Sequence, residues 1–279
     1  MNTSTPTSTS APIAFIGGGN MASAIIGGLL RNGLPADRVL VVEPFAEARA
    51  KLAADHGIQA LEQAGPALAP AALVVWAVKP QVFKEAAAPV RAHAANALHL
   101  SVAAGIPSDS IARWLGTERI VRAMPNTPAL VGQGMTGLFP RAAVTAEDKQ
   151  RVEQALASTG ELLWVATEAQ LDAVTALSGS GPAYVFYFLE AMVQAGAAMG
   201  LPAAQAQRLA VATFAGATEL ARRSDEPLAT LRQRVTSKGG TTYAAITSMQ
   251  QDQVAEAFQR AMQAAEQRAR ELGEEFGAG

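Results

Sequence analysis

Cysteine is absent from this 279-residue sequence. The chain therefore has no disulfide framework and no thiolate to act as a nucleophile or metal ligand, which agrees with a reducing compartment such as the cytoplasm. Histidine is scarce as well, because the sequence has only 3, at His56, His93 and His99, and their spacing matches no metal-binding pattern. We expect each histidine to lie at the surface or at a helix end, and we predict no metal site.

Charge is also scarce, and neither sign dominates. Charged residues make up 16% of the sequence, with 22 Lys and Arg against 24 Asp and Glu, for a net charge of −2. No basic cluster alternates with aromatic residues, so nucleic acid is not an expected partner. The apolar run at residues 71–78 is too short to cross a membrane. Residues 1–11 lack the basic and apolar segments of a signal peptide, and we expect a disordered tail. We predict a cytoplasmic protein.

Apolar residues, by contrast, make up 49% of the chain. With so little charge, much of this surface must be buried, and the alanine-rich helices favour burial between subunits. The composition therefore favours a homo-oligomer over a monomer. The length suggests two domains.

A strand, a glycine turn and a helix open the ordered part of the sequence. Residues 13–16 are an uncharged apolar run, and the turn fits the pattern Gly17-x-Gly19-x-x-Ala22. In this pattern the first glycine makes the tight turn, the second lets the backbone approach a pyrophosphate, and the small third residue seats the helix on the strand. The helix start offers free N–H groups to phosphate. Glycine turns without a ligand are common, but the second strand at residues 39–42, which ends in Glu43, favours dinucleotide binding.

Apolar strands continue to alternate with helices up to about residue 166. This order predicts a Rossmann-type α/β fold with a doubly wound, mainly parallel sheet. Ligands of such sheets lie at the carboxyl ends of the strands, where this sequence places small or proline-containing turns. The spacing also allows a short strand at residues 58–61. The remaining predicted strands are residues 71–78, 98–103, 120–123 and 161–165.

Beyond residue 166 strands give way to helices. We expect a dinucleotide-binding domain at residues 12–166 and an all-α substrate and dimerisation domain at residues 167–279. The predicted helices of this second domain are residues 168–177, 182–199, 202–222, 228–235 and 241–271.

Two stretches of the helical half carry groups suited to chemistry. Ser180-Gly181-Pro182 has the pattern of a helix N-cap followed by proline, and a plain helix start that packs closely against a neighbour is the favoured interpretation. Residues 236–242 place two glycines among hydroxyls before a helix. Helix-start amides with Ser and Thr hydroxyls can hold a small carboxylate, and a capped turn between helices is the alternative.

Five motifs occur in a characteristic order between residue 13 and about residue 249. They are Phe15-Ile16-Gly17-Gly18-Gly19-Asn20-Met21, Ala77-Val78-Lys79-Pro80, Arg122-Ala123-Met124-Pro125-Asn126-Thr127-Pro128, Leu177-Ser178-Gly179-Ser180-Gly181-Pro182-Ala183-Tyr184 and Ser237-Lys238-Gly239-Gly240-Thr241-Thr242. Through these motifs the chain resembles the pyrroline-5-carboxylate reductase family. The resemblance implies an NAD(P)-binding domain, a helical domain that interleaves with its partner in a homodimer, often five dimers in a decamer, and reduction of 1-pyrroline-5-carboxylate to L-proline by NAD(P)H.

The resemblance also implies roles for individual residues. Thr242 would be the catalytic residue, with its hydroxyl near the ring nitrogen of the imine. The residues implied for substrate binding are Glu168, Ser237, Gly239, Gly240, Thr241 and Thr242, and those implied for the dinucleotide are Ile16, Gly17, Gly18, Gly19, Asn20, Met21, Glu43, Ala77, Val78, Lys79, Pro80, Ala103, Ala104 and Asn126, with Asn126 near the nicotinamide.

Two positions depart from the family pattern. Lys238 stands where the family usually has proline, and its charge either faces solvent or attracts the carboxylate. Glu43 stands where many relatives carry Ser or Thr near a 2′-phosphate. A carboxylate there would accept from a ribose 2′-hydroxyl and repel a phosphate, so we expect a preference for NADH, with Arg49 as the residue that would accommodate NADPH.

Two other functions are compatible with the same plan. One is a related imine or hydroxyacid reductase, although the sequence has no lysine between Gln150 and Arg234 for carbonyl chemistry. The other is a non-catalytic dinucleotide sensor, against which the hydroxyl-rich turn argues. The sequence leaves open the NADH or NADPH preference, the oligomer size, feedback inhibition by proline, the proton donor and the ring sizes accepted.

Overall fold

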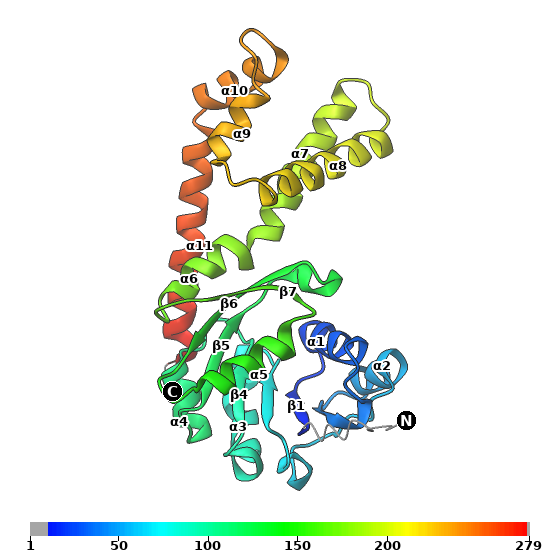
Figure 1. The fold of residues 1–279 in the computed structure, drawn as a ribbon, viewed down its shortest axis with the longest axis vertical. Helices are drawn as coiled ribbons and strands as arrows, with labels where there is room; N and C mark the ends of the chain where they lie inside the picture. The colour runs from blue at the N-terminus through cyan, green and yellow to red at the C-terminus, as the bar shows by residue number, and fades with distance from the viewer. Residues whose placement is uncertain (1–10, 278–279) are drawn as a thin grey trace, which may run out of the picture. The chain divides into compact units, whose positions relative to one another are not determined.

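The computed structural model describes residues 11–277, so all but the last residue of the predicted tail lies outside the described residues. Two compact units make up the chain (Figure 1). The first, here called the sheet unit, runs to Gly179 and also includes the chain from Ala265 onward, and the second, the helical unit, is Ser180–Ala264. The strands end at Trp164, close to the boundary at residue 166 in the sequence, but the sheet unit continues beyond it.

A 7-stranded sheet in the order β2-β1-β3-β4-β5-β6-β7 forms the centre of the sheet unit. Its pairs are parallel except for β5 and β6, which confirms the predicted mainly parallel, Rossmann-type fold. Ile16 pairs with Val42 on one side and with Trp76 on the other, so three strands end side by side at one edge. The strands are β1 (Ile13–Ile16), β2 (Val39–Val42), β3 (Leu73–Trp76), β4 (Leu98–Ser101), β5 (Ile120–Met124), β6 (Gly134–Pro140) and β7 (Gly160–Trp164).

Helices cover both faces of this sheet, which explains why its strands are apolar without alternation. Phe15 packs in a core with Ile25 of α1 and Val152 of α5. Its neighbour Ala14 belongs to a second core with Phe83 of α3. The helices and 3₁₀ turns are α1 (Asn20–Arg31), η1 (Ala36–Arg38), α2 (Ala46–His56), η2 (Pro66–Leu68), α3 (Pro80–Ala94), α4 (Ser108–Leu115), η3 (Thr127–Val131) and α5 (Ala146–Leu156).

One predicted strand is absent, and one observed strand was not predicted. Residues 58–61 form no strand, and only an isolated bridge joins Leu61 to Val42. The sequence analysis missed β6, whose glycines weaken its strand pattern. These glycines allow close packing, because a Cβ on Gly137 would lie 2.7 Å from Val174 Cγ1 and one on Gly134 would lie 2.7 Å from the Thr159 carbonyl oxygen.

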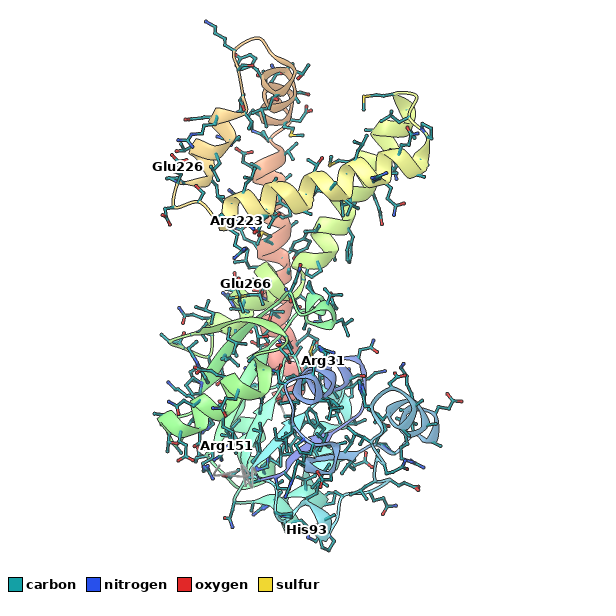
Figure 2. All side chains as sticks on the ribbon, turned by 45° about the vertical axis from the view of Figure 1, so that its right-hand side comes forward. Arg31, His93, Arg151, Arg223, Glu226 and Glu266 are labelled. Atoms are coloured by element: carbon teal, nitrogen blue, oxygen red, sulfur yellow. The ribbon has the colours of Figure 1, made fainter. Side chains whose placement is uncertain are left out.

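The chain leaves the sheet unit through α6 (Gln170–Val174) and a π-helical turn, Thr175–Gly179. The helical unit then contains α7 (Gly181–Ala198), α8 (Ala203–Arg222), α9 (Leu228–Arg234) and α10 (Thr241–Gln251). Figure 2 marks the α8–α9 connection with Arg223 and Glu226, and Glu226 Oε1 accepts a 2.6 Å hydrogen bond from Arg234 Nη2.

The last helix, α11 (Val254–Gly277), begins in the helical unit and ends in the sheet unit. The sequence analysis merged it with α10 into one helix, and this was wrong. The break lies at Gln253, which has a positive φ of 53°. No helix within residues 11–277 combines the length and apolar character needed to cross a membrane.

Candidate functional site

The glycine turn after β1 is shaped by close contact with β3. Gly17 has φ 92°, and a Cβ there would lie 2.6 Å from the Ala77 carbonyl oxygen, so only glycine fits. Gly19 is the N-cap of α1, where no side chain accepts a hydrogen bond from the helix start. A Cβ on Gly19 would meet nothing within 4 Å. The start of α1 at Gly19 and Asn20 is therefore exposed and has no side-chain cap, which suits a bound pyrophosphate.

Glu43 holds this turn against the end of β2. Its carboxylate is 6% exposed, and its two oxygens accept from main-chain amides, Oε2 from Gly18 at 2.8 Å and Oε1 from Phe45 at 2.9 Å. The sequence analysis treated Glu43 only as an acceptor for a ribose. In the structure it first organises the turn, and each oxygen keeps a lone pair for a further donor.

The Arg49 guanidinium already has hydrogen-bond partners near the end of β2. Its Nη1 donates to the main-chain carbonyls of Glu43 at 3.0 Å and Pro44 at 2.6 Å, and its Nη2 lies 3.6 Å from Glu62 Oε2. The guanidinium thus caps carbonyl groups that the strand leaves unpaired. A 2′-phosphate would have to compete with these partners.

The other predicted dinucleotide residues follow β3, β4 and β5. Lys79 is the exposed N-cap of α3, with Pro80 in the first turn. Ala103 is buried, whereas Ala104 is exposed. Asn126 bridges two segments of the sheet unit, since its Nδ2 donates to the Ser178 carbonyl at 3.1 Å and its Oδ1 accepts from the Met135 amide at 2.9 Å. The Asn126 amide therefore fixes the π-helical turn to β6.

Glu168 is bound entirely within the sheet unit. Its Oε1 accepts from the Ser108 amide and from Arg122 Nη1, and its Oε2 accepts from the Ser108 hydroxyl, all at 2.6 Å. Arg141 Nη1 also donates to the Ser108 hydroxyl at 3.0 Å. The sequence analysis missed Ser108 and Arg122 as partners. Arg122 was detectable as an unpaired charge inside an otherwise apolar strand.

The histidines divide into two groups. His56 and His93 lie in the last turns of α2 and α3, as predicted, and His56 Nε2 lies 2.6 Å from Ser23 Oγ. His99 is fully buried in β4, so its predicted surface or helix-end position was wrong. Its Nδ1 accepts from Trp76 Nε1 at 3.0 Å, and burial lowers its pKa to about 4. His99 is therefore a neutral core residue. Among the described residues, no three or more His, Cys, Asp or Glu side chains are grouped so that they could hold a metal ion.

The second predicted site lies at the start of α10 in the helical unit. Gly239 has φ 75°, and Gly240 is the N-cap, where again no side chain caps the helix. The Gly240 amide donates to the Ser237 carbonyl at 3.0 Å, and a Cβ on Gly240 would lie 2.7 Å from Ser237 Oγ. The turn thus brings the Ser237 hydroxyl close to Gly240, at the start of α10 that has no side-chain cap. Thr242 is half-buried in the first turn of the helix, and Lys238 is exposed.

Comparison with known proteins identifies the family. Residues 168–272 match the family model described as "Pyrroline-5-carboxylate reductase dimerisation". Residues 12–105 match a second family model, described as "NADP oxidoreductase coenzyme F420-dependent". A pyrroline-5-carboxylate reductase from Pseudomonas aeruginosa is 47% identical over 269 residues, which cover 95% of this chain and 98% of that protein. The chain belongs to the pyrroline-5-carboxylate reductase family.

Solved structures of this family are similar over the same length. A pyrroline-5-carboxylate reductase from Coxiella burnetii has a TM-score of 0.88 and 36% identity, covering 95% of this chain and 99% of that one. The Plasmodium falciparum pyrroline carboxylate reductase, solved with NADP bound, has a TM-score of 0.85 and 26% identity, covering 95% and 98%.

The family assignment confirms the predicted activity. The protein is an oxidoreductase of proline biosynthesis that reduces 1-pyrroline-5-carboxylate to L-proline with NAD(P)H. Its dimerisation domain supports a homo-oligomer.

Proposed function

We propose that the glycine turn and the neighbouring strand ends hold NAD(P)H. The open N-terminus of α1 supports this assignment, because its amides and positive dipole end suit the pyrophosphate. The turn is already fixed, since Gly17 packs on Ala77 and the Gly18 amide is bound by Glu43. The other residues assigned to the dinucleotide are Ile16, Gly19, Asn20, Met21, Val78, Lys79, Pro80, Ala103, Ala104 and Asn126.

The turn at residues 237–242 is assigned to the imino acid. Open amides at the start of α10 and the Ser237 hydroxyl suit a carboxylate, and Gly239 allows the turn. The glycine N-cap leaves the helix start accessible. Gly240, Thr241 and Thr242 complete this site, and the exposed Lys238 adds positive charge near it.

The chemistry requires positioning more than a strong acid. When bound, NAD(P)H supplies the hydride that reduces the imine carbon. Thr242 is assigned the hydrogen bond to the ring nitrogen, where its hydroxyl can donate to or accept from the nitrogen as the imine becomes an amine. The Ser237 hydroxyl and the amides of α10 hold the carboxylate and so fix the ring. Proximity and orientation then account for most of the rate gain.

Glu168 has a supporting place in this proposal. Both of its oxygens already accept hydrogen bonds within the sheet unit, and Oε1 accepts two. A contact with the imino acid would share a carboxylate that already holds Arg122 and the start of α4. We therefore assign Glu168 to positioning first.

A preference for NADH follows from Glu43, directly after β2, and Arg49 of α2. The buried Glu43 carboxylate would repel a 2′-phosphate, and Arg49 is bonded to main-chain carbonyls. We expect kcat/KM to be at least roughly tenfold higher with NADH than with NADPH, and Glu43→Ser to reduce that ratio. A strong NADPH preference of the unchanged enzyme would contradict this assignment.

The finer points of assembly and location rest on the sequence. A decamer of five dimers and a cytoplasmic location are proposed from the resemblance and the absence of cysteine. Sedimentation of the purified protein measures the subunit number directly.

The decisive experiment follows oxidation of NAD(P)H when 1-pyrroline-5-carboxylate is added to the purified enzyme. We expect Thr242→Ala to lower kcat/KM at least roughly tenfold, the cost of about one hydrogen bond in the transition state, while NAD(P)H binding persists. Thr242→Ser keeps the hydroxyl and is the matched control. Unchanged kinetics in Thr242→Ala would remove Thr242 from the mechanism.

A further inference from the structure

Phe45 is an exposed aromatic ring beside the glycine turn. Its side chain is 72% exposed, and no other aromatic side chain in the described part of the sheet unit is classed as exposed. Burying a phenylalanine side chain typically stabilises a protein, and Phe45 forgoes this gain in the single chain. A single exposed apolar residue is common on protein surfaces, but the backbone around Phe45 is unusually well fixed.

One carboxylate links Phe45 to the glycine turn. Glu43 accepts from the Gly18 amide through Oε2 and from the Phe45 amide through Oε1, at 2.8 and 2.9 Å. Because Glu43 is buried, this link is shielded from water and fixes the backbone at Phe45 relative to the turn. The ring therefore projects from a defined point and not from a freely moving loop.

The neighbouring chain strengthens this support. Phe45 is the N-cap of α2, and its carbonyl accepts from the Arg49 amide at 3.0 Å. The Arg49 guanidinium binds the carbonyls of Glu43 and Pro44 on the way into the helix. The backbone on both sides of Phe45 is thus held by hydrogen bonds, while its ring has no partner among the aromatic contacts of the described residues.

We infer that the Phe45 ring forms one wall of an adenine subsite. This inference rests on the proposed function, in which the pyrophosphate lies on the glycine turn and the ribose meets Glu43. The next group along an adenine dinucleotide is the base, whose flat apolar face suits an exposed phenyl ring. Removing an aromatic side chain on which a base stacks typically weakens binding by a factor of about 5 to 150.

Binding of ADP-ribose to the full-length protein tests the inference without the reaction. Calorimetry with Phe45→Ala is expected to show a Kd raised roughly tenfold, the low end of the stacking range. Phe45→Trp keeps a ring and is expected to bind at least as tightly as the unchanged protein. Phe45→Leu keeps apolar bulk without a π face and is expected to fall between Phe45→Ala and the unchanged protein.

A second measurement separates this inference from the proposed function. Reduced nicotinamide mononucleotide lacks the adenosine, so its KM is expected to be the same in Phe45→Ala and in the unchanged enzyme, while the KM for NADH rises. Equal ADP-ribose affinity in Phe45→Ala and the unchanged protein would overturn the inference and leave the dinucleotide site standing. If the unchanged protein bound neither ADP-ribose nor NADH, the proposed dinucleotide site would fail and the inference with it.

Because Phe45 is exposed, these variants are expected to keep the circular dichroism of the unchanged protein. If Phe45→Ala lost this circular dichroism, the ADP-ribose affinities of Phe45→Leu and Phe45→Trp would test the inference instead.

Discussion

The two units of the chain treat their apolar side chains in opposite ways. In the sheet unit, large side chains such as Phe15, Trp76 and Phe83 are fully buried between sheet and helices. In the described helical unit the only buried residues are the small Gly196, Ala206 and Ala210. Its large apolar residues are exposed in the single chain, among them Phe186, Tyr187, Leu209, Leu220 and Tyr243. The sheet unit completes its own core, whereas the helical unit leaves apolar surface for a partner.

The physical reason lies in the geometry of the elements. A parallel sheet can be covered on both faces by helices of its own chain. The helices α7 and α8 pack closely through Gly196, where a Cβ would lie 2.8 Å from the Ala206 Cβ. This contact uses small residues and leaves the larger side chains on the outer faces. An apolar surface of this kind marks a protein interface, in agreement with the dimerisation domain of the family.

The largest predicted effect is a weaker dimer after a substitution on the exposed apolar surface of the helical unit. Phe186 is 58% exposed on α7, within the residues that match the dimerisation domain. If this apolar surface forms the interface, Phe186→Asp places a charge in it. We expect the dimer to weaken by roughly 100-fold, or about 3 kcal/mol, which is typical of a central interface residue. Light scattering across a concentration series measures this. Lys149→Asp, a charge change on α5 of the sheet unit, is the control, and a dimer of unchanged affinity in Phe186→Asp would place the interface elsewhere.

A pair of glycine substitutions compares the packing of the two units. In α1 a Cβ on Gly28 would lie 1.6 Å from Ser158 Oγ, so Gly28→Ala is expected to cost about 2 kcal/mol of unfolding free energy through overpacking. In α8 a Cβ on Gly216 would meet nothing within 4 Å of the single chain. There Gly216→Ala is expected to gain about 1 kcal/mol from helix propensity. Urea unfolding measures both.

The outcomes of this pair also locate the interface. If Gly216→Ala destabilises the dimer, a partner side chain fills the space around Gly216. If Gly28→Ala is neutral, Ser158 has moved aside, and adding Ser158→Gly would then bring no further gain.

A pH dependence of the unfolding free energy is also predicted, and it arises in the sheet unit. Burial lowers the pKa of His99 from its usual 6.5 to about 4. Between these values the unfolded chain binds a proton that the folded chain does not, so stability falls as the pH drops below 6.5. Linkage gives a loss of about 2 kcal/mol between pH 7 and pH 5. His99→Gln keeps an acceptor for Trp76 without titrating near these values, and a pH profile identical to that of the unchanged protein would rule out His99 as the cause.

Much of the sheet unit was predictable because its signals are local. The apolar runs, Gly33 and Gly57 at the ends of α1 and α2, and the glycine turn each depend on a few neighbouring residues. The strand β6 was not predictable in this way, because its glycines serve contacts with distant residues such as Thr159 and Val174.

By itself the sequence determined the alternation of strands and helices, the two helix starts suited to anions and the family. Only the tertiary structure decided what the polar side chains do. It placed Glu43 between two amides, buried His99 beside Trp76 and joined Glu168 to Ser108 and Arg122. The physical reason is that periodicity and turn chemistry are written in neighbouring residues, whereas a hydrogen bond across the fold depends on which distant backbone arrives at the same place.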